Sequence, residues 1–140
     1  MCALNVGKGM KLSMKKITKD NLDSFMEYYH GFHDSYITHI HYDTYQEKIE
    51  LSFDVCWSSK PVLREDNTYE TNRTKMKMEL NRVKQCNIKE IFSWDYINHA
   101  FMKYLTLEEE EYLCFASDEE DPLLYIVCEE IEYEDLKESW

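Results

Sequence analysis

One change in the spacing of apolar residues divides this chain into two parts. Before Gly31, the residues Leu22, Phe25, Met26 and Tyr29 follow the i, i+3, i+4, i+7 spacing of one helix face. After Gly31, apolar and polar residues alternate, which is the pattern of a strand with one buried side. The chain is therefore expected to fold as a sheet with a helix packed against it.

The helix is expected over residues 20–30, where Asp20 is a plausible N-cap and Gly31 supplies the C-terminal stop. The first 13 residues lack any periodicity, so residues 1–13 are expected to be a poorly ordered extension. With 140 residues, the chain has room for one core. Residues 14–140 are thus expected to form a single domain.

Residues 36–43 and 49–57 alternate as two strands, and the short polar connection between them predicts an antiparallel hairpin. In the first strand, one phase is assigned to the core and the other to solvent. The predicted core phase is Tyr36, Thr38, Ile40 and Tyr42, and the predicted outer phase is Ile37, His39, His41 and Asp43.

Alternation resumes over residues 73–83, which predicts a third strand. Residues 87–105 fit a helix turn or a strand, and the strand-forming side chains there favour a strand first, with a turn near Asp95. Two short apolar runs, 112–115 and 123–128, predict a second hairpin.

The expected fold class is α+β, a mostly antiparallel β-sheet with one N-terminal amphipathic helix packed on it. Apolar residues of the predicted strands form the expected core of the sheet. They include Ile40, Leu51, Phe53, Val55, Met78 and Ile126.

The net charge of -12 is concentrated in the last quarter of the chain. Residues 105–140 hold 14 acidic residues and one lysine, whereas the rest of the chain is nearly neutral. Such a surface repels nucleic acid and anionic membranes and attracts a basic protein face. The candidate partner-binding residues are Glu108, Glu109, Glu110, Glu111, Asp118, Glu119, Glu120 and Asp121.

A weak basic stripe occupies the third predicted strand. It consists of Arg73, Lys75, Lys77, Arg82 and Lys84. Because the overall pI is near 4.8, phosphate binding is disfavoured, and the stripe is expected to pair with the acidic C-terminal strand, within the domain or between copies.

The densest group of chemically capable side chains is His30, His33, Asp34, His39, His41 and Asp43. His39 and His41 share one face of a strand, so a metal site with His33 is geometrically conceivable. The simpler interpretation is a solvent face on this strand, with Asp34 accepting backbone N–H bonds at the strand entry. No metal or other cofactor is expected.

No residue is assigned a catalytic role. The sequence has no phosphate-binding glycine motif, no carboxylate pair that stands out from the acidic background, and no local signature of an activated cysteine. Five widely spaced cysteines and no secretory segment predict reduced thiols in a cytoplasmic protein, and no apolar run is long enough for a membrane span.

Three segments resemble small uncharacterised bacterial proteins, some of which are similar to immunity proteins of polymorphic toxin systems. The segments are residues 32–37 (FHDSYI), 92–97 (FSWDYI) and 128–132 (CEEIE). The resemblance covers roughly residues 20–135 and implies a sheet-dominated domain without enzymatic activity that neutralises a toxin by binding it.

Two hypotheses follow. The first is a non-enzymatic cytoplasmic binding module whose acidic C-terminal surface takes a basic partner, such as a nuclease toxin. The alternative is a small metal-dependent enzyme or metal-binding protein centred on His33, His39 and His41.

Overall fold

The computed structural model describes residues 14–58, 62–70, 73–89, 96–97, 100–118 and 120–136. The expected extension over residues 1–13 lies outside them. The described chain is mostly antiparallel β-sheet with a helix, which confirms the α+β class. In chain order the elements are β2 (Lys15–Lys16), α2 (Leu22–Tyr28), the short turn η1 (His30–Phe32), β3 (Ser35–Asp43), β4 (Lys48–Val55), β5 (Val62–Leu63), β6 (Tyr69–Glu70), β7 (Thr74–Ile88), β8 (Tyr96–Ile97), β9 (Phe101–Leu107), β10 (Glu110–Ala116) and β11 (Leu124–Asp135).

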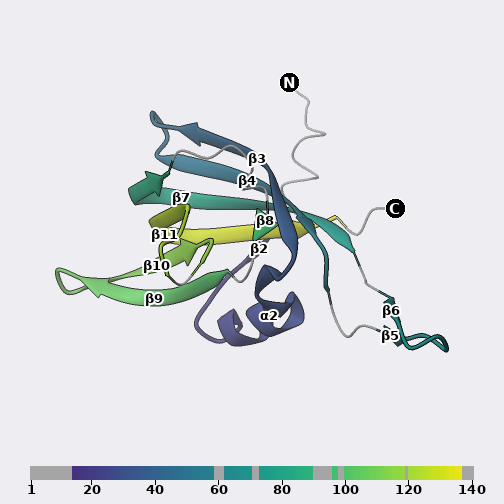
Figure 1. The fold of residues 1–140 in the computed structure, drawn as a ribbon. Helices are drawn as coiled ribbons and strands as arrows, with labels where there is room; N and C mark the ends of the chain where they lie inside the picture. The colour runs from purple at the N-terminus through teal and green to yellow at the C-terminus, as the bar shows by residue number, and fades with distance from the viewer. Residues whose placement is uncertain are drawn as a thin grey trace, which may run out of the picture.

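The main sheet has eight strands in the order β8-β3-β4-β7-β11-β10-β9, with β2 paired to β11. Figure 1 shows these strands as one curved layer with α2 beside it, while the β5–β6 hairpin projects away. β8 and β9 lie at opposite ends of the order, yet only positions 98–100 separate them along the chain. Because four residue steps reach at most about 14 Å, the two ends of the sheet must curl toward each other.

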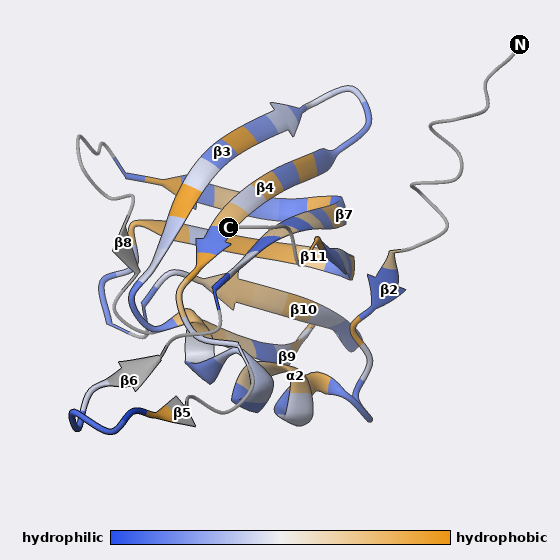
Figure 2. Ribbon diagram, turned by 90° about the vertical axis from the view of Figure 1, so that its right-hand side faces the viewer, coloured by the Kyte–Doolittle hydropathy of each residue, from blue (hydrophilic) through white to orange (hydrophobic). Residues whose placement is uncertain are grey.

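Both predicted hairpins are confirmed, β3 with β4 and β10 with β11. The third strand is also confirmed and continues to Ile88, beyond its predicted end. The alternation is visible in Figure 2 as apolar and hydrophilic bands along β3 and β4. It buries one side of the sheet, where Leu51 lies opposite Met78 and Phe53 lies opposite Met76.

The predicted faces of β3 are wrong at its beginning. Ile37 is 6% exposed and lies opposite Phe53, whereas Tyr36 is 38% exposed. The register shifts between Ile37 and His39, and such a bulge moves the following side chains to the opposite phase. In the rest of the strand the prediction is right for Ile40, which packs against the core and lies opposite Leu51. It is wrong for Thr38 and for Tyr42, which are both exposed, Tyr42 to 41%.

The helix starts later than predicted, at Leu22, with Asn21 rather than Asp20 at the N-cap. The Asn21 carboxamide accepts a hydrogen bond from the Thr18 backbone N–H at 2.8 Å, which holds the chain entering the helix. Leu22 and Phe25 are buried against the sheet. Gly31 follows the end of the helix with a φ of 61°, as its role of stop requires.

The turn after the helix is left-handed at three successive residues. His30, Gly31 and Phe32 have φ values of 52°, 61° and 59°. Only glycine adopts this region without cost. The turn places the Phe32 ring in the core, fully buried and 4.9 Å from the ring of Phe53. Burial of this large ring offsets the strain.

Residues 87–105 are only partly described. The expected turn near Asp95 lies outside the described residues. Strand β7 ends at Ile88, β8 pairs with the beginning of β3, and β9 pairs with β10 along its whole length. A strand assignment is thus confirmed for the described parts of this stretch.

Candidate functional site

The turn between β9 and β10 carries the most concentrated negative charge of the described chain. We call Glu108, Glu109, Glu110 and Glu111 the acidic turn. Leu107 pairs with Glu110, so Glu108 and Glu109 are the two central residues of a two-residue hairpin. Both are exposed, and their φ values are 51° and 71°.

A two-residue hairpin with positive φ at both central positions normally carries Asn-Gly, because these residues tolerate the left-handed region. Glu108 and Glu109 adopt it at a steric cost of about 1–2 kcal/mol each. Glu111 forms an ion pair of 2.6 Å with Lys19, and Glu110 accepts a hydrogen bond of 3.2 Å from the Tyr112 hydroxyl. The acidic turn is thus held close to the segment that leads into α2.

The second predicted acidic run lies at the other end of β10. Asp118, Glu120 and Asp121 belong to the β10–β11 connection, and Glu119 lies outside the described residues. Six residues, 112–117, separate the two runs, and five of them belong to β10, so the runs lie about 20 Å apart. The seven described acidic residues therefore do not form the single face that the sequence predicted, because a hairpin strand places its two flanking turns at opposite ends.

The β10–β11 connection is closed by local contacts. The Ser117 hydroxyl oxygen accepts hydrogen bonds from the backbone N–H groups of Leu123 and Leu124, each 3.1 Å. Asp121 forms an ion pair with Lys89 at the end of β7. Asp121 of this second acidic run is thus engaged in an ion pair within the fold.

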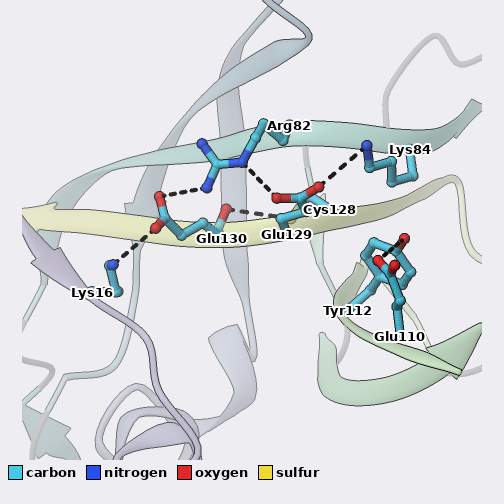
Figure 3. A network of polar contacts seen from close by, with 8 residues as sticks. All are labelled: Lys16, Arg82, Lys84, Glu110, Tyr112, Cys128, Glu129 and Glu130. Atoms are coloured by element: carbon cyan, nitrogen blue, oxygen red, sulfur yellow. Dashed lines mark hydrogen bonds and ion pairs between the residues drawn. The ribbon is translucent and has the colours of Figure 1, made fainter.

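The acidic residues of β11 are paired with the basic stripe on β7, as the sequence predicts for Arg82 and Lys84 (Figure 3). Arg82 Nε lies 2.6 Å from a Glu129 oxygen, and Lys84 Nζ lies 3.3 Å from the other. Glu130 is contacted by Lys16 at 2.9 Å and by Arg82 at 3.4 Å.

This network lowers the pKa of two carboxyl groups. The pKa of Glu129 falls because of the hydrogen bonds from Arg82 and Lys84, and that of Glu130 falls chiefly because of the bond from Lys16. The network lies where the β7–β11 register shifts and where Arg82 itself has a φ of 54°. The network therefore joins β7 and β11 at an irregular part of the sheet. In the network, both Glu129 and Glu130 form ion pairs with two basic side chains each. In the acidic turn, within the described residues, the ion pair with lysine or arginine is the one between Glu111 and Lys19.

The predicted histidine cluster is divided between two places. His39 and His41 stack on the outer face of β3, with ring centroids 6.4 Å apart. His33 lies beside Asp34, at 3.5 Å, before β3 begins. Asp43 closes the next turn by accepting the Tyr45 and Gln46 backbone N–H groups.

Asp34 lies just before β3 and accepts a hydrogen bond from a side chain there. The indole N–H of Trp57 donates to its carboxylate over 3.4 Å. Within the described residues, no group of three or more His, Cys, Asp or Glu side chains is arranged to hold a metal ion. The triad of the alternative hypothesis, His33 with His39 and His41, is therefore not assembled as a metal site.

Four cysteines lie in the described chain, all as free thiols: Cys56, Cys86, Cys114 and Cys128. Burial raises the pKa of each thiol, and that of Cys128 to about 12. A nucleophilic cysteine needs a lowered pKa. These four thiols lack that property.

A cleft that the sequence did not indicate opens between α2 and the end of β11; we call it the aromatic cleft. Its volume is about 400 Å³. The lining residues are Lys15, Asn21, Ser24, Phe25, Tyr28, Tyr29, Tyr133 and Asp135. Its two walls come from segments about a hundred positions apart, so no local motif could reveal it.

Comparisons with known proteins give no relative for this chain. No protein family, no curated protein and no solved structure matches it. No helix of the described chain has the length and apolar character needed to cross a membrane.

Proposed function

We propose that this protein is a non-enzymatic cytoplasmic binding module that takes a basic protein partner on its acidic turn. The observation that carries the proposal is the pair Glu108 and Glu109, two exposed carboxylates held in left-handed backbone at the tip of a hairpin. Strained backbone is commonly retained where it serves a function.

Turn chemistry alone does not account for this choice of residues. Asn-Gly would form the same hairpin with less strain and would remove two negative charges. Retaining two glutamates favours a role for their charge. Exposed charges steer a complementary partner toward its site and raise the association rate.

The kind of partner follows from the charge and from the resemblance to immunity proteins. A basic protein such as a nuclease toxin would be attracted by the net charge of -12. In this proposal, the protein neutralises such a toxin by binding it. Free thiols at the four described cysteines support a reducing, cytoplasmic location.

The test is association with a basic protein encoded beside this gene, measured at about 20 mM and about 150 mM ionic strength. Replacing Glu108 and Glu109 by Gln should slow association about tenfold at low salt and leave the fold intact. The matched control is Glu47→Gln with Glu65→Gln, two exposed glutamates outside β9 and β10. An unchanged association rate in the Glu108/Glu109 variant would reject the acidic turn as the binding surface.

A further inference from the structure

The aromatic cleft is built around one carboxylate and several inclined rings. Tyr133 lies 4.6 Å from Phe25 and 6.4 Å from Tyr29, measured between ring centroids, and Tyr28 lies 4.8 Å from Tyr29. The interplanar angles of these pairs lie between 57° and 79°. Rings inclined in this way present both edges and faces to the space between them.

The carboxylate belongs to Asp135 and is oriented by two hydroxyl groups. Tyr29 donates to Oδ2 over 2.6 Å, and Thr74 donates to Oδ1 over 2.5 Å. These two bonds fix the orientation of the carboxylate, and a carboxylate accepts hydrogen bonds at up to about four sites. Burial, and then the charge of Asp135, raise the pKa of Tyr133, so its phenol stays neutral beside the carboxylate.

The other polar groups of the cleft favour a cation over an anion. The Asn21 side-chain amide donates to the Lys16 carbonyl, and the Ser24 hydroxyl donates to the Asn21 carbonyl. Lys15 could donate to an anion, but its side chain is exposed on β2 and can extend into solvent. The oriented carboxylate and the ring faces, by contrast, both attract positive charge.

We propose that the aromatic cleft binds a cationic side chain, a guanidinium or an ammonium group, presented by the basic partner. This deepens the proposed function and rests on it for the identity of the partner. The cation would contact the faces of Tyr28 and Tyr133 and donate a hydrogen bond to Asp135. The attraction of ring faces for cations and the charge-assisted bond to a carboxylate supply the recognition.

The sign of the bound charge can be tested with small probes. N-acetylarginine amide is titrated into the ¹⁵N-labelled full chain, and the backbone amide shifts are followed by NMR. The shifts of Ser24, Tyr28 and Tyr133 should saturate with a Kd on the order of millimolar, as expected for one side chain. Benzoate, an anion with an aromatic ring, should give no saturating shift.

Two conservative variants make the test specific. Lys15→Gln removes a like charge and should strengthen arginine binding about two- to fivefold, whereas Tyr28→Leu removes a ring face and should weaken it several-fold. The matched controls are Lys103→Gln on β9 and Tyr45→Leu in the β3–β4 turn, which should change nothing. Lys15 and Tyr28 are both exposed, so neither variant endangers the fold.

Three results would overturn the cationic assignment: saturation by benzoate, weaker arginine binding in Lys15→Gln, or no saturating shift with arginine up to about 50 mM. The outcome is separable from that of the acidic turn. If arginine binds here while Glu108→Gln/Glu109→Gln leaves partner association unchanged, the acidic turn fails and the cleft remains. If the turn variant slows association but arginine does not bind, the cleft fails alone.

Discussion

The hydroxyl group of Tyr29 donates a hydrogen bond of 2.6 Å to Asp135, 106 positions further along the chain. The same carboxylate accepts a bond from Thr74 at the start of β7. One side chain thus joins the end of the helix to two neighbouring strands. The contact is partly buried, so its loss should affect stability.

Replacing Tyr29 by Phe removes this bond and keeps the ring. Because hydrogen bonds to charged groups are among the stronger ones, we expect the free energy of unfolding to fall by about 1–3 kcal/mol. Urea unfolding measures the change. The control is Tyr28→Phe, whose ring is 40% exposed and which should stay within about 0.5 kcal/mol of the parent.

The raised pKa of Tyr29 should make the protein lose stability at alkaline pH. Burial, and then the bond to Asp135, raise the pKa of Tyr29 far above its ordinary value. A raised pKa in the folded state contributes stability that is present below about pH 10 and is lost as pH rises further, because only the unfolded chain releases the proton. Unfolding free energies measured from pH 8 to pH 11 should fall more steeply in the parent than in Tyr29→Phe. Equal slopes would contradict this.

Phe53 is a core residue, and its truncation should lower the free energy of unfolding strongly. Its ring is 1% exposed and lies 4.9 Å from Phe32 and 5.9 Å from Phe115. Phe53→Ala should lower the free energy of unfolding by about 3–5 kcal/mol through lost burial and the resulting cavity. Leu63→Ala, at a side chain 56% exposed, is the comparison and should change little. Melting of the Phe53 variant at the parent temperature would show that this ring is not needed in the core.

Turn strain and turn charge can be separated at Glu108 and Glu109. Changing them to Asn and Gly supplies the residues that this backbone favours, and should raise the free energy of unfolding by about 1–3 kcal/mol. Changing both to Gln keeps the strain, and should leave stability within about 0.5 kcal/mol. Both variants should slow association with the partner. Stabilisation by Gln as strong as by Asn-Gly would mean that charge repulsion, and not backbone strain, destabilises the turn.

The histidines are expected to hold no metal. Elemental analysis of protein purified without an affinity tag should find well under one zinc, manganese or iron per chain. A nearly stoichiometric metal that disappears in His39→Ala/His41→Ala would reverse this prediction and restore the metal-dependent alternative.

The acidic turn could be found from the sequence, but its isolation from the second acidic run could not. A run of four glutamates between two apolar stretches is visible by eye. Whether Asp118 and Asp121 lie beside it depends on how many strand residues separate the two turns and on how those strands pair. The predicted run over 112–115 was too short to show that β10 spans the whole distance.

Alternation determined the strands and the buried side of β4, because each inward residue there is followed by an outward one. Gly31 determined the end of the helix, because few other residues adopt its backbone without strain. Only the tertiary structure decided the bulge that exchanges Tyr36 and Ile37 and the meeting of Tyr29 with Asp135. The sequence predicted that Arg82 pairs with the acidic C-terminal strand, and the structure decided that its partner is Glu129 of the same chain. Local spacing reports the side of an element that is buried, whereas register and contacts between distant segments depend on the packing of the whole chain.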